Sequence, residues 1–211
     1  GDSVVLIGHS APGMAGSAYA ALAGLSSEDR PPGIDLDREA ALQSFIREAI
    51  GRALVASAQD VSGGGLAVAI AECCMWSGLG ARLRLGVSGS PAIELFGESP
   101  GRLVLSCRPR HAPAVELLAR QFGLAAETLG SVGGDRLRIE LTGQGATGAA
   151  EERGSGVADA LDVALADLRH TWDHGLARAL GVEPGPGHEQ GYAPEAVSRA
   201  VPPDIAADGG D

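Results

Sequence analysis

Residues 58–74 read AQDVSGGGLAVAIAECC, in which an acidic, glycine-rich turn directly precedes a dense apolar run. The apolar run is typical of a buried helix, and the residues before the turn are typical of a short strand. If residues 63–65 open the helix, their free N–H groups favour an anion, because a helix N-terminus carries a partial positive charge. The stretch therefore predicts either a phosphate-facing turn or a tight connection in which Asp60 and Ser62 only cap the helix.

The carboxylate of Asp60 weighs on the choice between these two interpretations. It would repel a phosphate at close range, so a phosphate there requires a bridging Mg²⁺ or a displaced carboxylate. Glycine-rich turns between a strand and a helix are also common where no ligand binds. Spacing alone therefore favours a structural connection over a phosphate site.

A second polar turn, ELFGESPGR at residues 94–102, lies between an expected short helix and an expected strand. Glu98 and Ser99 could reach a ligand or a metal from this turn, since carboxylates and hydroxyls serve both purposes. Charged residues at the end of a helix are, however, usually solvated. The residues alone favour a solvated turn without a ligand.

Hydrophobic periodicity predicts strands and helices that interleave along the chain. Residues 81–87 alternate cleanly, with Arg82 and Arg84 on the opposite side from the apolar residues, as in a half-buried strand. Residues 134–141 also alternate and predict an antiparallel strand at or near a sheet edge. Further strands are expected at residues 3–7, 102–107 and just before the glycine turn, and helices at residues 16–24, 37–55, 112–123, 165–180 and from the glycine turn to residue 78. This order predicts an α+β layered domain.

The composition is that of a soluble globular protein, with 211 residues of which 45% are hydrophobic and 20% charged. The formal charge of −11 argues against a nucleic-acid binder, which normally presents a basic surface. All 16 basic residues are arginine, so chemistry that requires lysine is excluded. No apolar run is long enough to cross a bilayer, and three cysteines without a CxxC spacing indicate a reduced, cytoplasmic protein.

The composition also changes along the chain. Residues 142–156 are glycine-rich and barely hydrophobic, which predicts a surface loop. After residue 181 the sequence is dominated by Gly, Pro, Ala and acidic residues and lacks the apolar residues of a core. We therefore expect one domain over residues 1–180 and a disordered tail over residues 181–211. The first residue is not methionine, which indicates a fragment or a processed chain.

Five segments occur in an order that resembles a known family: GDSVVLIG, AGSAY, AQDVSGGGLAVAIAE, ELFGESPGR and GSVGGDRLRI. Together they closely resemble the last domain of phosphoribosylformylglycinamidine synthase, which is related to aminoimidazole ribonucleotide synthetase. The resemblance covers residues 1–180, and its most specific part is the pairing of the glycine turn with ELFGES. It implies a three-layer α/β/α domain with a mixed sheet that partly resembles a ferredoxin-like sheet.

The resembling enzyme uses ATP to activate formylglycinamide ribonucleotide, and ammonia from glutamine then gives formylglycinamidine ribonucleotide in de novo purine biosynthesis. The resemblance thus implies an ATP-dependent C–N ligase that uses ATP and Mg²⁺. It implies as partners the remaining domains of the synthetase, a glutaminase subunit and a small accessory subunit, and no nucleic acid or membrane. Because the family's catalytic histidine and main magnesium ligands lie outside the matched segment, no catalytic residue is assigned, and the isolated chain is expected to be inactive.

By resemblance, the two turns face a nucleotide or its phosphates, and Asp60 is also a metal ligand. The residues carried over by position are Asp60, Ser62, Gly63, Gly64, Gly65, Glu98 and Ser99. Two positions depart from the family, since Gln59 replaces the usual histidine and Gly63 replaces a usual acidic residue. If that acid helps to bind a metal, this chain has lost a ligand; if it only charges the start of the helix, little changes.

Three other functions stay open on the sequence. The chain could belong to another ATP-using member of the same superfamily, such as a small-molecule kinase or synthetase. It could be a non-catalytic interface domain that offers its surface to a partner. It could also be a structural domain without a ligand.

Overall fold

The computed structural model describes residues 1–8, 11–25, 30–87, 89–143, 157–179 and 181. The chain forms two compact units, Gly1–Trp172 and Asp173–Asp211, and the first holds the whole described sheet. Residues 144–156 of the expected loop, and all of the expected tail except residue 181, lie outside the described residues. The loop and the tail therefore stay predictions.

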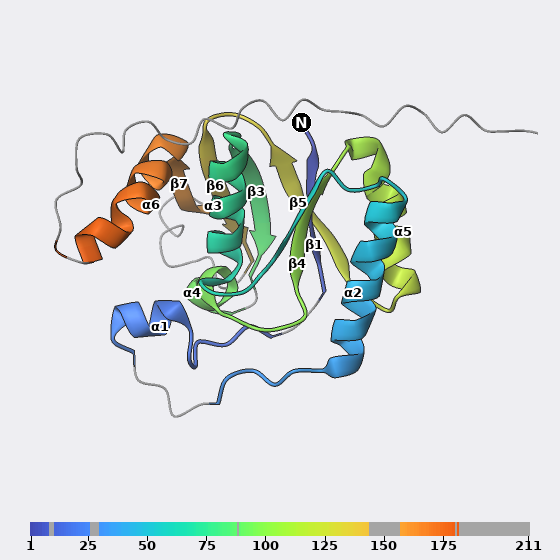
Figure 1. Ribbon diagram of the computed structural model, residues 1–211, viewed down its shortest axis with the longest axis horizontal. Coiled ribbons are helices and arrows are strands. Elements are labelled where there is room, and N and C mark those ends of the chain that lie inside the picture. Colours follow the sequence, from blue (N-terminus) through green and yellow to red (C-terminus); the bar gives the residue numbers. More distant parts are fainter. Residues whose placement is uncertain (9–10, 26–29, 88, 144–156, 180, 182–211) are drawn as a thin grey trace, which may run out of the picture. The chain divides into compact units, whose positions relative to one another are not determined.

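A seven-stranded mixed sheet forms the centre of the first unit, in the order β2-β4-β1-β5-β3-β6-β7 (Figure 1). Every pair of neighbours is antiparallel except β3 and β6, which are parallel. The strands are β1 (Ser3–Ile7), β2 (Ser57–Asp60), β3 (Ala81–Gly86), β4 (Leu103–Cys107), β5 (Ala126–Val132), β6 (Arg136–Thr142) and β7 (Val157–Ala164). The mixed sheet confirms the fold class expected from the sequence.

Helices cover both faces of the sheet, which gives the three layers implied by the resemblance. On one face α3 packs against the sheet together with residues of α4 and α6, and on the other face lie α2 and α5 (Figure 1). The helices are α1 (Ala18–Ala23), α2 (Leu36–Gly51), α3 (Gly65–Ser77), α4 (Pro91–Phe96), α5 (Ala112–Gln121) and α6 (Leu165–Ala179), with a short 3₁₀ helix η1 (Pro109–His111).

One hydrophobic core lies on each face of the sheet. The first is centred on α3, from which Leu66 and Ile70 pack onto the sheet. This helix is apolar on most sides, as expected of a helix that neighbours cover all round. The second core contains the fully buried Phe45 of α2 and Val115 of α5. The first core also buries the inward-facing apolar residues of β3 and β6, in agreement with the alternation of both segments.

The clearest sequence patterns are confirmed. Along β3 the apolar residues are buried and Arg82 and Arg84 are exposed, as the alternation predicts. Helix α2 is also present, but it ends at Gly51 rather than near residue 55. It stops there because Ala53 adopts a left-handed conformation, with φ of 54°, which a helix cannot continue.

Three features of the sheet differ from the sequence expectation. β6 is second from the edge, as expected, but it pairs in parallel with β3 and is antiparallel only to β7. Neither β5 nor β7 is predicted by the patterns. In β5 the neighbours Glu127 and Thr128 are both exposed, and the register with β1 shifts between Val4 and Val5. This irregularity removes the period-2 signal that identifies a strand.

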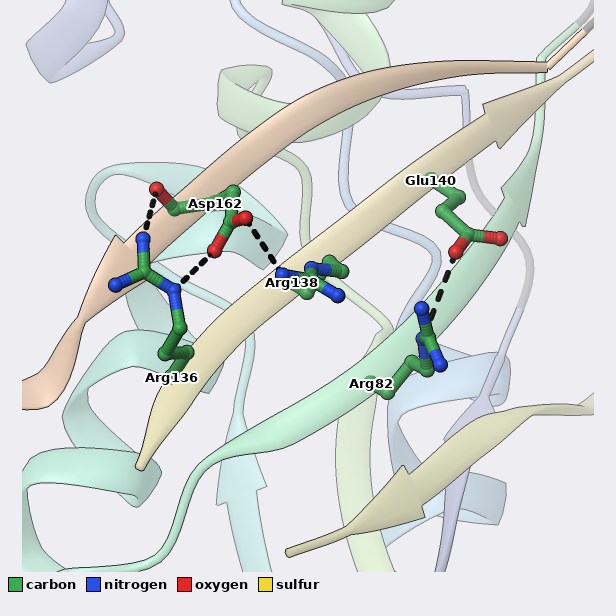
Figure 2. Close-up of polar contacts among 5 residues, drawn as sticks. All are labelled: Arg82, Arg136, Arg138, Glu140 and Asp162. Atoms are coloured by element: carbon green, nitrogen blue, oxygen red, sulfur yellow. Dashed lines mark hydrogen bonds and ion pairs between the residues drawn. The ribbon is translucent and has the colours of Figure 1, made fainter. Parts of the chain in front are cut away.

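An ionic cluster covers β3, β6 and β7 on the face opposite the α3 core (Figure 2). Its members are Arg82, Arg84, Arg136, Arg138, Glu140 and Asp162. Arg136 and Arg138 both donate to the carboxylate of Asp162, at 2.5 and 2.7 Å, while Arg84 donates to Glu140 at 3.0 Å. Cross-strand pairs of this kind stabilise the register of neighbouring strands.

Leu118→Ala is expected to lower the free energy of unfolding by about 2–5 kcal/mol, because it leaves a cavity in the second core. Leu118 is 3% exposed, whereas its neighbour Leu117 on the same helix is 53% exposed. Leu117→Ala is therefore the matched control and should change the value by no more than about 0.5 kcal/mol. Urea unfolding measures both, and equal losses would contradict the orientation of α5.

Hydrogen bonds from Arg136 and Arg138 hold the pKa of Asp162 below its usual value. A carboxyl whose pKa is lower in the folded than in the unfolded protein stabilises the fold above its unfolded pKa. That contribution is lost as the pH falls through the lowered pKa. The melting temperature of the wild-type chain should therefore be higher than that of the Asp162→Asn variant at neutral pH. The difference between the two melting temperatures should vanish in strong acid. Melting curves across this range test it, and a gap that did not change with pH would refute it.

Candidate functional site

The glycine turn joins β2 to α3, which begins at Gly65 with Gly64 as its N-cap. Gly64 and Gly65 have φ of 81° and 73°, a conformation that residues with a Cβ rarely adopt. Both are also tightly packed. A Cβ on Gly65 would lie 2.7 Å from the backbone of Phe96, and one on Gly64 would lie 2.5 Å from Val68. The fold itself therefore requires these two glycines.

Gly63 differs from its two neighbours. It is exposed, and no atom lies within 4 Å of the position that its Cβ would take. The fold thus leaves room for the acidic side chain that the resemblance implies at this position. Packing does not require glycine at residue 63.

The carboxylate of Glu98 occupies the N-terminal end of α3. Its Oε1 accepts hydrogen bonds from the backbone N–H groups of Gly64 and Ala18, each at 2.8 Å. Ala18 is the first residue of α1, so one oxygen caps the starts of two helices. The backbone of Glu98 also pairs with that of Gly13 in both directions. Glu98 thus takes the place that the sequence interpretation gives to a phosphate.

Only part of the expected anion site is open. The N–H of Gly65 donates to the carbonyl of Ser62 at 3.0 Å, and the N–H of Gly64 is bound by Glu98. The expectation that the amides of residues 63–65 converge on a ligand is therefore not met at Gly64 and Gly65. Gly63 does line a cavity, and its contact with a ligand stays a prediction.

Arg102 connects the two turns. It is 5% exposed, its Nη2 donates to the carbonyl of Gly97 at 3.0 Å, and its own carbonyl accepts the N–H of Val61 at 3.1 Å. Because Glu98 directly follows Gly97, these bonds hold its carboxylate at the start of α3. Burial lowers the pKa of Arg102, and Glu94 partly opposes that shift. Arg102 is therefore a positioning residue.

An open cavity of about 850 Å³ lies beside the two turns, and its opposite wall is α2. The residues expected from the sequence that line it are Asp60, Ser62, Gly63, Glu98 and Ser99. Gly64 and Gly65 are buried and do not line it. The structure thus brings most of the expected residues to one cavity, although the two turns that carry them lie more than 30 positions apart in the chain.

The cavity is acidic. The carboxylates of Glu39, Asp60 and Glu98 line it, and the buried Arg102 is the only basic residue among the described lining residues. The sequence explains Glu39 only as a favourable charge at the start of α2. It reaches the cavity because α2 packs beside the second turn, where a Cβ on Gly101 would lie 3.4 Å from its Oε1. Such a cavity disfavours a bare phosphate and favours a ligand that carries positive charge.

The described residues contain no group of three or more His, Cys, Asp or Glu side chains that could hold a metal ion. Asp60, the expected metal ligand, therefore lacks a complete set of partners within the described part of this chain. Mg²⁺ commonly takes one or two carboxylates and completes its shell with water and phosphate oxygens. A metal at Asp60 would need its other ligands from a nucleotide or from another domain.

Burial favours the protonated form of the three cysteine thiols. Burial raises the pKa of Cys73, Cys74 and Cys107, and burial together with the neighbouring Cys73 takes that of Cys74 to about 11. The reactive thiolate is therefore scarce at neutral pH.

None of the described helices has both the length and the apolar character that crossing a membrane requires.

Comparisons with known proteins agree with the geometry. Residues 1–142 match the family model described as AIR synthase related protein, C-terminal domain. The phosphoribosylformylglycinamidine synthase subunit PurL of Thermobifida fusca is 41% identical over 183 residues, covering 86% of this chain and 22% of the relative. The same subunit of Moorella thermoacetica is 38% identical over 144 residues, covering 68% of this chain and 20% of the relative.

Solved structures of Thermotoga maritima PurL share the fold. The complex with FGAR has a TM-score of 0.63 at 20% identity, covering 80% of this chain and 28% of that chain. The PurLQS structure has a TM-score of 0.60 at 22% identity, covering 78% of this chain and 25% of that chain.

The layered sheet and its two turns define the class of domain to which the chain belongs. The chain belongs to the AIR synthase related protein family, of which it represents the C-terminal domain. This confirms the family expected from the sequence motifs. The chain spans about a fifth of the length of the curated relatives described above.

Glu98→Ala is expected to lower the free energy of unfolding by about 1.5–3 kcal/mol, because the N–H groups of Gly64 and Ala18 lose a charged acceptor. Glu98→Gln keeps an acceptor oxygen without the charge and should lose less. Glu48→Gln breaks an exposed pair with Arg52 and serves as the control, with a change of no more than about 1 kcal/mol. Urea unfolding compares the three, and a wild-type value for Glu98→Ala would exclude Glu98 as the cap.

Proposed function

We propose that this chain is the C-terminal domain of a phosphoribosylformylglycinamidine synthase. Such an enzyme is an ATP-dependent C–N ligase that converts formylglycinamide ribonucleotide and glutamine-derived ammonia to formylglycinamidine ribonucleotide. The observation that carries the proposal is the meeting of the two family turns at one cavity, joined by the hydrogen bond from Gly64 to Glu98. The identities of 38% and 41% to PurL subunits support it.

In this proposal the chain supplies one wall of a cleft whose other wall belongs to the rest of the synthetase. Some of the expected residues face the ligand directly, and the others shape the turn from behind. Those proposed to face the ligand are Asp60, Ser62, Gly63 and Ser99. Those that shape the turn are Gly64, Gly65 and Glu98, because their backbone or carboxylate groups are bonded within the domain.

We propose ATP as the nucleotide of the whole enzyme. Thermotoga maritima PurL, which shares this fold, has been solved in complex with ATP and with ADP. Because carboxylates line the cavity, a polyphosphate would approach it together with a divalent cation, for which the family implies Mg²⁺. Asp60 would give that cation one oxygen ligand, and the nucleotide and the other domains would give the rest.

The proposed partners are the remaining domains of the synthetase, a glutaminase subunit and a small accessory subunit. The PurLQS structure of Thermotoga maritima, which shares the fold, supports an association with further subunits. We propose a cytoplasmic location, with which the absence of a disulfide among the three cysteines agrees. The net charge of −11 gives no support to a nucleic-acid partner.

A non-catalytic interface domain is the second candidate, and the position of Glu98 favours it. The protein's own carboxylate already satisfies the amide of Gly64 that would otherwise bind a phosphate. A domain of this kind would support the architecture of the synthetase without touching the nucleotide. The two candidates differ in whether Asp60 affects turnover.

The 211-residue chain alone should release no phosphate from ATP in the presence of formylglycinamide ribonucleotide and ammonia, whereas the full-length synthetase should release it. In the full-length enzyme, Asp60→Asn should lower kcat/KM by about tenfold or more, since the cavity would lose a carboxylate toward the cation. A phosphate-release assay measures both.

Asp37→Asn is the matched control for this assay. Asp37 is an exposed carboxylate at the start of α2 and does not line the cavity. Unchanged turnover in both variants would favour the interface domain over the ligand-binding wall. Turnover by the isolated chain, or a full-length enzyme that does not use formylglycinamide ribonucleotide, would refute the proposed function.

A further inference from the structure

β2 leaves one edge of the sheet open. Among the strands that the structure describes, it stands first in the sheet order and pairs only with β4. Val61 donates its N–H to the carbonyl of Arg102, which continues the β4 side of the pairing. Because the backbone groups of successive residues in a strand point to opposite sides, Ala58 and Asp60 direct their N–H and C=O groups away from β4. No strand within the described part of the chain pairs with these outward groups. An extended polypeptide can add to such an edge by backbone hydrogen bonds.

A groove runs along this edge. Residues 58–63 form one side of it. The other side is formed by Ile46 and Ile50 of α2 and by Ile34, which precedes this helix. Ile34 and Ile50 are 62% and 59% exposed, although both are large and apolar. A strand placed in the groove would turn alternate side chains toward this apolar wall. The groove therefore has the two elements that strand addition requires, an open edge and a surface for side chains.

The charge of the groove restricts what can occupy it. Glu39 and Asp60 lie along it, which favours a basic residue at that point of the occupant. Pairing of β2 with β2 of a second copy would bring Asp60 of both copies into one short ladder, opposite or diagonal to each other, and like charges on paired strands are destabilising. The net charge of −11 also opposes association of two copies.

The length of the relatives points to the occupant. The aligned segments cover 20% and 22% of two PurL subunits, so about four-fifths of such a protein lies outside them. Resting on the proposed function, we propose that the groove between β2 and α2 receives an extended segment of the remaining synthetase chain. This segment is apolar at alternate positions, carries a basic residue near Glu39, adds a strand to β2 and closes the cavity on that side.

Hydrogen exchange tests the pairing directly. In the 211-residue chain the amides of Ala58 and Asp60 should exchange rapidly. In the full-length synthetase their exchange should be slower by a factor of about ten or more. Equal exchange in the two proteins would overturn the proposal. Protection that appears in the isolated chain only as its concentration rises would assign the edge to a second copy and would overturn it too.

Ala58→Pro is the matching perturbation. Because the N–H of Ala58 points away from β4, proline there removes no bond of the isolated sheet but blocks pairing at the edge. In the full-length synthetase this variant should exchange its Asp60 amide as fast as the isolated chain does. Ala58→Val keeps the N–H and should retain the protection. If Ala58→Pro fails to fold, the exchange comparison of the two wild-type proteins still decides.

Turnover separates this proposal from the proposed function. A full-length synthetase that uses formylglycinamide ribonucleotide but leaves the amides of Ala58 and Asp60 unprotected would overturn the groove proposal alone. A full-length protein with protected amides and no such turnover would support the strand addition and refute the proposed function.

Discussion

The structure around the cavity depends on the carboxylate of Glu98. One of its oxygens binds the amides of Gly64 and Ala18, so the starts of α3 and α1 are both tied to the turn before β4. A helix begins with N–H groups that have no acceptor inside the helix, and a charged acceptor satisfies them strongly. Arg102 holds the turn in place through the carbonyl of Gly97. Segments that are distant in the sequence therefore share one electrostatic anchor.

This anchor changes how the glycine turn can act. A turn with free amides would attract a phosphate, whereas here an internal carboxylate occupies the start of α3 and further carboxylates line the adjoining cavity. A polyphosphate is compatible with such a wall only in company with a cation. The same cavity is lined by residues of β2, so its proposed ligand-facing end and the proposed groove for a partner strand form a single surface. Both properties suit a domain that completes a site together with a larger protein.

Regular local patterns predicted those parts of the fold in which the burial of a residue follows directly from its position along one strand or helix. The alternation of β3 and the apolar run of α3 are of this kind. β5 was not predictable, because a register shift against β1 disrupts its alternation. The parallel pairing of β3 with β6 was missed too, since pairing direction depends on how the chain returns to the sheet. Glu39 joined the cavity only through the packing of α2.

The sequence by itself determined the family, the layered α/β class and the residue types at the two turns, because these are written in motifs and short periodic patterns. Only the tertiary structure decided how those residues are bonded and packed. It showed that Glu98 binds the amide that a phosphate was expected to bind, and that Gly64 and Gly65 serve close packing. It also showed that β2 ends the described sheet beside an apolar wall. Such relations join residues far apart in the chain, and no local pattern encodes the distance between them.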